Sequence, residues 1–174
     1  LKAENETFKK ELGFVQATPA GLEPCTVLSV DPVSLTDTLV LNCGKNKGIA
    51  EGQAVVSHGY LVGKIIYAGD STSTALLITN SQSTVDARIS SNTIEGVVKG
   101  SFGSGVILDL ISQNADLKKG DLIVTAGINN RIAANIPIGQ VGDVISQPNE
   151  LFKRTSISTP IRFHEISYVF VAKR

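Results

Sequence analysis

Apolar residues recur at a spacing of three and four only within the first 14 residues, LKAENETFKKELGF. Four residues would share one side of a helix and form a narrow coiled-coil seam, with Asn5 at an a position: Leu1, Asn5, Phe8 and Leu12. A helix this short is marginal alone in water, where ~12–15 residues is borderline. The pattern predicts the end of a coiled coil that dimerises the chain through these residues. A short amphipathic helix packed on its own domain is the alternative.

After a linker at 15–24, the pattern changes to short β-branched runs separated by Gly, Pro, Asn and Asp, which is typical of strands and turns. The runs predict strands at Cys25–Val30, Thr38–Asn42, Gln53–Val56, Tyr60–Tyr67, Thr74–Ile78, Thr84–Ile89, Thr93–Val98, Gly105–Leu110, Leu122–Thr125, Gly139–Ile145, Ser156–Ser158 and Ile166–Val171. No amphipathic run of crossover length follows residue 14, which excludes a parallel α/β sheet. The sequence therefore predicts an all-β fold.

One glycine frame occurs twice. Gly52 and Gly59 bracket the apolar run 54–56, and Gly120 and Gly127 bracket 122–124; both glycines are displaced by 68 residues (120 − 52 and 127 − 59). The run 62–66 is then matched with 141–145, although a chance echo in a glycine-rich β chain is the alternative. Seven glycines are expected at structural turns: Gly52, Gly59, Gly63, Gly120, Gly127, Gly139 and Gly142.

The duplicated frame predicts two small β-domains, each a sandwich or a barrel, after the short N-terminal coiled-coil helix. The expected domains are the helix at 1–14, a first β-domain at 15–84, a second β-domain at 85–160, and a closing strand within 161–174 that could return to the first domain.

Composition narrows the function. The 174 residues are 42% hydrophobic, which is enough for a core, and 16 basic residues balance 16 acidic ones, so nucleic-acid binding is disfavoured. No apolar run approaches the ~20 residues that span a bilayer, and no signal peptide is present. Because the chain starts in mid-pattern and lacks methionine, we expect a membrane anchor or export signal further upstream.

The two cysteines, Cys25 and Cys43, lie in or beside apolar runs without CxxC spacing. With only two histidines besides, a zinc site is disfavoured, and we expect no metal and no cofactor. The simplest interpretation is two buried thiols on neighbouring strands. A disulfide is the alternative in an oxidising compartment.

No catalytic residue is predicted. A pair of barrels would invite comparison with chymotrypsin-like serine hydrolases, but Ser71 is followed by Thr72, and no acidic residue between His58 and Asp70 could orient the imidazole. The glycines at 100, 103 and 105 lack the lysine and the helix of a phosphate loop.

Three apolar residues in polar loops are candidate partner contacts: Phe102, Ile128 and Ile132. The alternatives are that Phe102 folds back on its own barrel, and that Ile128 and Ile132 plug a barrel end together with Ile136. We prefer the plug for the isoleucines.

The order and spacing of several blocks resemble the extracytoplasmic part of the rod shape-determining MreC family. The blocks are Leu1–Leu12, Leu41–Gly44, Gly48–Ile49, Gly52–Val56, Gly59–Ile65, Gly96–Gly100, Gly120–Gly127, Ile136–Gly139, Val141–Gly142 and Tyr168–Val171. Ala126, Arg162 and the cysteines depart from the family pattern.

The resemblance implies that the two β-domains are two small antiparallel β-barrels, and that the protein is a non-catalytic scaffold of the cell-wall elongation machinery that maintains rod shape. It would be anchored in the inner membrane with this part on the periplasmic or extracytoplasmic side, form homodimers, and contact a class B penicillin-binding transpeptidase, with MreD, MreB and RodA as associated partners. The chief rival is a periplasmic adaptor of an efflux or secretion system, since Glu51–Val55 is similar to a lipoyl-type half-motif.

Overall fold

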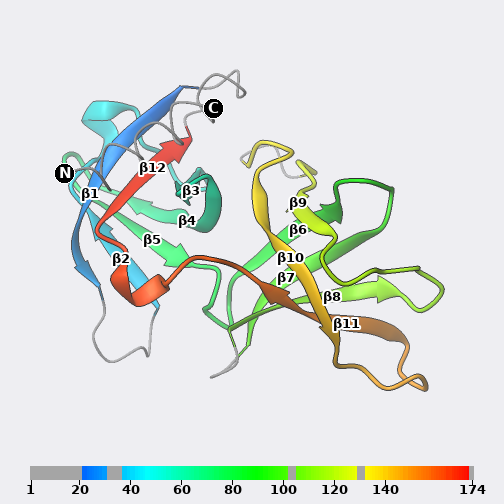
Figure 1. The fold of residues 1–174 in the computed structure, drawn as a ribbon. Coiled ribbons are helices and arrows are strands. Elements are labelled where there is room, and N and C mark those ends of the chain that lie inside the picture. Colours follow the sequence, from blue (N-terminus) through cyan, green and yellow to red (C-terminus); the bar gives the residue numbers. More distant parts are fainter. Residues whose placement is uncertain (1–20, 31–36, 102–104, 129–131, 173–174) are drawn as a thin grey trace. The chain divides into compact units, whose positions relative to one another are not determined.

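The computed structural model describes residues 21–30, 37–101, 105–128 and 132–172. These residues form twelve strands and two short 3-10 helices, η1 (Lys45–Lys47) and η2 (Phe163–Glu165) (Figure 1). The strands make two closed barrels, so the predicted all-β, two-barrel fold is confirmed. The predicted N-terminal helix and its seam lie outside the described residues. Within the described part of the chain, no helix has the length and apolar character needed to cross a membrane.

The first barrel contains six strands in the order β1-β12-β3-β4-β5-β2. Their bounds are β1 (Leu22–Val30), β2 (Thr38–Leu41), β3 (Ala54–Ser57), β4 (Tyr60–Ala68), β5 (Ser73–Leu77) and β12 (Tyr168–Ala172). Alternating burial marks the inward side of strands such as β2 and β5. Leu39, Leu41, Leu61 and Ile65 are fully buried and fill the barrel interior.

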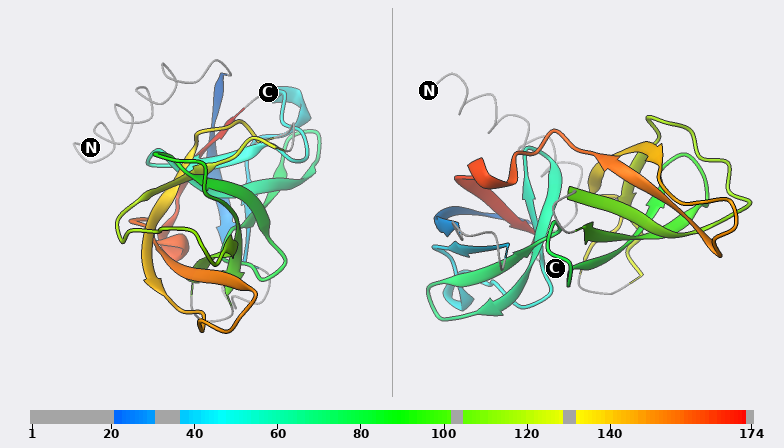
Figure 2. Two further views of the ribbon diagram at one scale, coloured as in Figure 1. Left: turned by 90° about the vertical axis from the view of Figure 1, so that its right-hand side faces the viewer. Right: turned by 90° about the horizontal axis from the view of Figure 1, so that it is seen from below.

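The second barrel also contains six strands, in the order β10-β11-β8-β7-β6-β9. Their bounds are β6 (Thr84–Ile89), β7 (Glu95–Ser101), β8 (Gly105–Ser112), β9 (Leu122–Thr125), β10 (Pro137–Val144) and β11 (Phe152–Ser158). Ile89, Leu108, Ile123 and Ile138 are fully buried in its interior. Figure 2 gives two further views of the same strands.

The chain leaves the first unit and comes back to it. One compact unit ends at Leu76 and resumes at Ile161, and the other runs Leu77–Pro160. The first boundary thus falls before the expected 84–85, and Thr84 begins the second barrel instead of ending the first. Strand β12 pairs with β1 and β3, so the closing strand belongs to the first barrel.

The duplicated glycine frame corresponds to β3–β4 and β9–β10, but its second half needs a correction. Gly63 lies opposite Val55, and Gly139 lies opposite Ile123, which stands 68 residues after Val55. The run 62–65 therefore matches 138–141, and the predicted match to 141–145 is wrong by three residues. The error arose because 138–141 and 141–145 both begin with an apolar residue and glycine.

The glycines expected at turns divide into two groups. Gly52, Gly59, Gly120 and Gly127 have the left-handed backbone that favours glycine, with φ between 72° and 93°. The other three, Gly63, Gly139 and Gly142, lie within strands instead of turns. At Gly139 an added Cβ would lie 2.6 Å from the carbonyl oxygen of Ser158, so the close approach of β11 requires glycine there.

Cys25 and Cys43 form a disulfide with a Cα–Cα distance of 5.7 Å. The expectation of two free thiols is wrong, and the alternative that the sequence left open is correct. Antiparallel pairing of β1 with the end of β2 brings the two residues together. Beside them, the N–H of Asn42 donates to the carbonyl of Thr26, and the N–H of Thr26 donates to Oδ1 of Asn42.

Candidate protein-binding face of the second barrel

The residues considered for catalysis lie in two separate turns of the first barrel. His58 lies in the β3–β4 turn, where its Nδ1 is 3.0 Å from the hydroxyl of Ser57. Ser71 is exposed in the separate turn between β4 and β5. No group of three or more His, Cys, Asp and Glu side chains that could hold a metal ion occurs among the described residues.

Exposed apolar side chains gather on the second unit instead. Six large hydrophobic residues of the described part of this unit are exposed, and five of them lie at one end of β8, β10 and β11: Leu110, Val144, Ile145, Leu151 and Phe152. Leu151 is 87% exposed, the highest value among them. We call these five residues the hairpin face, because four of them belong to the hairpin that joins β10 and β11.

Strand pairing explains why residues distant in sequence meet in the hairpin face. Phe152 lies opposite Ser112 of β8, and Val144 lies opposite Thr155. The N–H of Ile145 donates to the carbonyl of Arg154, which extends the β10–β11 ladder into the hairpin. Both views of Figure 2 show this hairpin, in orange, at the periphery of the second unit.

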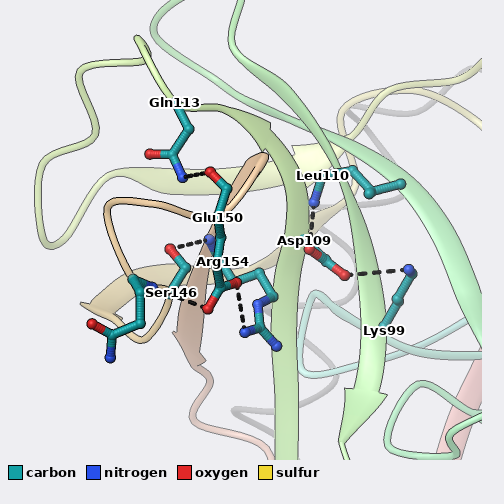
Figure 3. Close-up of polar contacts among 8 residues, drawn as sticks. Lys99, Asp109, Leu110, Gln113, Ser146, Glu150 and Arg154 are labelled. Atoms are coloured by element: carbon teal, nitrogen blue, oxygen red, sulfur yellow. Dashed lines mark hydrogen bonds and ion pairs between the residues drawn. The ribbon is translucent and has the colours of Figure 1, made fainter.

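A bulge places the fifth residue outside the barrel. The register of β11 against β8 shifts between Lys153 and Thr155, and Leu110 has a φ of 56°. The bulge leaves Ile111 buried and Leu110 exposed. Asp109 supports this backbone, because its carboxylate accepts the N–H of Leu110 at 2.7 Å and pairs with Lys99 at 3.3 Å (Figure 3).

Glu150 braces the hairpin from inside its own turn (Figure 3). Its carboxylate accepts the N–H of Gln147 at 3.2 Å and pairs with Arg154 at 2.9 Å. Its carbonyl accepts a hydrogen bond from the side-chain amide of Gln113, which follows β8, at 2.6 Å. The N–H of Arg154 in turn donates to the hydroxyl of Ser146. The hairpin is therefore tied to β8 as well as to itself.

The backbone N–H of Gln147 lowers the pKa of Glu150 below its ordinary value, and Arg154 lowers it further. The carboxylate consequently stays ionised at neutral pH and keeps both partners. Its charge and that of Arg154 offset each other. The hairpin face therefore combines apolar side chains with a locally neutral, ordered support, which reduces the ordering cost of binding.

Of the residues predicted as partner contacts, the two that the structure describes do not belong to the hairpin face. Phe102 is outside the described residues. Ile128 is 62% exposed and Ile132 is half-buried, whereas Ile136 is buried, so only Ile136 has the burial expected of a barrel plug. The sequence interpretation missed the hairpin face because it began the strand at Ser156, whereas β11 begins at Phe152. The adjacent apolar pair Leu151-Phe152 directly after Asn149-Glu150 was a visible signal.

Comparison with known proteins identifies the family. The sequence profile described as "Rod shape-determining protein MreC, barrel core" matches residues 27–173. The chain belongs to the MreC family. It is 26% identical over 172 residues to the cell shape-determining protein MreC of Haemophilus influenzae, covering 98% of this chain and 49% of the relative. MreC of Bacillus subtilis is 28% identical over 190 residues, covering 100% and 64%. The chain thus spans about half to two thirds of the length of these MreC proteins.

Solved MreC structures have the same fold. A structure described as MreC superposes with a TM-score of 0.85 at 22% identity, covering 98% of each chain. A complex between the penicillin-binding protein PBP2 and MreC from Helicobacter pylori contains a chain that matches with a TM-score of 0.72 at 17% identity, covering 88% of this chain and 98% of that one. At these identities the likeness concerns the fold.

Proposed function

We propose that this protein is a shape-determining scaffold of the cell envelope that binds a penicillin-binding protein through the hairpin face. Membership of the MreC family supports the shape-determining role. A partner of this class is supported by the Helicobacter pylori MreC, which has the same fold and is found in complex with PBP2. The function is binding and positioning, without catalysis by this chain.

The observation that carries the proposal is the concentration of exposed apolar side chains on a braced hairpin. Binding energy at protein interfaces concentrates in a few large anchors that lose water on contact. Leu151 and Phe152 are side chains of this kind, 87% and 46% exposed. Their backbone is held by Glu150, so the anchors are presented with little further ordering.

The test is a titration of the purified chain with the class B penicillin-binding protein encoded by the same genome. The double variant Leu151→Ser/Phe152→Ser removes both anchors from positions with high exposure, so its thermal stability should stay near that of the wild type. We expect its Kd to rise at least ~30-fold, which corresponds to the ~2 kcal/mol of a hot spot.

A matched control lies in the first barrel. Leu28 and Tyr67 are 57% and 60% exposed, so Leu28→Ser/Tyr67→Ser removes comparable apolar area from a different surface. We expect this control to bind with the wild-type Kd. Equal loss in both double variants, or no loss in the hairpin variant, would count against the hairpin face, and absence of binding by the wild type would count against the partner.

The remaining features of the proposal rest on family resemblance. We propose a homodimer formed through the N-terminal seam, attachment to the inner membrane with the barrels on the extracytoplasmic side, and association with MreD, MreB and RodA. Light scattering of the wild type and of Phe8→Asp tests the dimer, since a charge at a seam position should lower the mass.

A further inference from the structure

The first barrel contains a chemical group that the second lacks. Both cysteines of the sequence belong to the first unit, and they form the disulfide Cys25–Cys43. Cys25 is 1% exposed and Cys43 is 0% exposed. The disulfide is therefore enclosed in the folded barrel, and a reagent in solution reaches it only when the barrel opens.

Strand order shows what occupies the same place in the second barrel. Read around each barrel, β4-β5-β2-β1-β12-β3 corresponds to β10-β11-β8-β7-β6-β9. Val55 of β3 corresponds to Ile123 of β9. Following the residue pairs into the next strands, β12 and β6, matches Val169 to Ala87. Following them further, into β1 and β7, matches Cys25 to Gly96.

Two side chains of β8 lie beside Gly96. An added Cβ at Gly96 would lie 3.0 Å from Cδ1 of Leu108 and 3.2 Å from Cγ1 of Ile111, so these side chains occupy the space beside the glycine. Both are fully buried. The second barrel fills with large apolar side chains the interior position that the first barrel fills with a disulfide.

The order of strands along the chain determines when this interior position is accessible. Cys25 lies opposite Val169 of β12, and β12 follows the entire second unit in sequence. Strands β1 and β2 are close in sequence and pair directly with each other. The two cysteines can therefore meet in the β1–β2 pair before β12 covers β1.

We propose that Cys25 and Cys43 are an oxidative modification site, converted to the disulfide by thiol–disulfide exchange before β12 closes the first barrel. The oxidant is a disulfide donor, either a thiol oxidoreductase or a small-molecule disulfide. One cysteine thiolate attacks the donor disulfide, which forms a mixed disulfide and releases one donor thiolate. The second cysteine thiolate then displaces the other donor sulfur. The two cysteines lose two electrons and two protons, and the donor gains them as two thiols.

The first barrel would therefore need an oxidising compartment to form its disulfide, whereas the second barrel has no cysteine that requires oxidation. Disulfides of this kind persist in oxidising compartments. The burial of both sulfur positions makes the bond structural and not a reversible switch in the folded protein, since buried structural cysteines are inert. This inference does not depend on the identity of the binding partner.

The test uses the full chain and the variant Val169→Asp, which places a charge in a fully buried position of β12 and prevents its docking. Each oxidised protein is treated with dithiothreitol in native buffer, and released thiols are counted with a maleimide over time. We expect the wild type to be reduced more than about tenfold more slowly than the variant, because reduction requires opening of the barrel. Equal rates would overturn the proposal.

A second measurement covers the forward reaction. The wild-type chain is unfolded and reduced, then refolded with oxidised glutathione added either at the start or after tyrosine fluorescence has become constant. We expect oxidation in the first case to outpace that in the second, and Val169→Asp to show no difference between them. If late addition oxidises the wild type as fast as early addition does, closure of the barrel does not control the reaction.

Discussion

The two barrels have the same circular order of six strands but are assembled from the chain in different ways. The strands of the second barrel come from one continuous segment, residues 84–158, whereas the first barrel is interrupted by that segment and needs β12 from beyond it. The first barrel contains a disulfide where the second packs Ile111 beside Gly96. The same architecture thus closes by local pairing in one unit and by long-range pairing plus a covalent bond in the other.

The feature that stabilises the fold and the surface proposed for binding lie in different barrels. Closing a barrel with a distant strand costs loop entropy that local pairing avoids, and a disulfide lowers the entropy of the unfolded chain. The second barrel has no such bond, yet it presents the braced hairpin face. We infer that folding of the first barrel depends on an oxidising environment, and that the second barrel provides the surface proposed to bind the partner.

The largest effect should come from preventing closure of the first barrel alone. Val169→Asp buries an unpaired charge in β12 and should cost more than ~4 kcal/mol of unfolding free energy in the first unit. All three tyrosines, Tyr60, Tyr67 and Tyr168, belong to this unit, so tyrosine fluorescence reports on it selectively. The second unit should keep its cooperative transition in circular dichroism. Loss of both transitions together would show that the barrels do not fold separately.

The next effect concerns the disulfide. The pair Cys25→Ala/Cys43→Ala removes a bond that spans 18 residues of sequence, and the first unit should lose ~3 kcal/mol. The midpoint followed by tyrosine fluorescence in urea should fall, and the transition of the second unit should not move. An unchanged tyrosine midpoint would show that the first barrel tolerates loss of the disulfide. The disulfide would then not stabilise the first barrel as the packing of Ile111 stabilises the second.

The converse substitution acts on the second barrel. An added Cβ at Gly96 would lie 2.8 Å from the backbone carbonyl oxygen of Asp109, which cannot move as freely as a side chain. Gly96→Ala should therefore destabilise the second unit by ~1–3 kcal/mol and leave the tyrosine signal of the first unit unchanged. At Gly105 nothing lies within 4 Å of an added Cβ, but the positive φ would strain an alanine. Gly105→Ala therefore controls for the added volume and not for backbone strain. Gly21→Ala, with open space and no positive φ, is the matched control.

The smallest effect concerns the brace of the hairpin. The lowered pKa of Glu150 means that its contribution is fully present above the ordinary carboxyl pKa of 4.5 and is lost as pH falls through the lower folded value. Glu150→Gln should abolish this dependence. The measurement is the amide exchange of Gln147 and Arg154 by NMR, with the amides of β3 as reference. If the protection of the Gln147 and Arg154 amides relative to the β3 amides does not fall in acid, the carboxylate does not brace the hairpin.

Much of the fold could be predicted because strand signals are local. The bounds Thr84–Ile89 and Leu122–Thr125 were predicted as the structure has them, since β-branched runs there end at turn residues. Pairing between distant segments was less accessible. The position of β12 depends on its pairing with β1 and β3, and no local sequence pattern specifies which strands pair. The disulfide likewise depended on the β1–β2 register, which the sequence left open.

The candidate site was harder to predict than the fold. Loop isoleucines attract attention in a sequence, but Ile136 is buried and Ile132 is half-buried. The hairpin face arises because a bulge at Leu110 and the pairing of β8 with β11 bring separate apolar residues to one end of the barrel. The apolar pair Leu151-Phe152 is visible in the sequence, but the three-dimensional arrangement decides which apolar residues are exposed together, so hydrophobicity along the chain could not identify the whole face.

Site-specific photo-crosslinking tests the central claim most directly. A photoreactive amino acid is placed at Leu151 in one variant and at Leu28 in another, and each is mixed with the class B penicillin-binding protein. Both positions are exposed, at 87% and 57%, so both probes can reach a partner that contacts their surface. We predict a crosslinked complex from Leu151 and none from Leu28. A crosslink from Leu28 with none from Leu151 would contradict binding through the hairpin face.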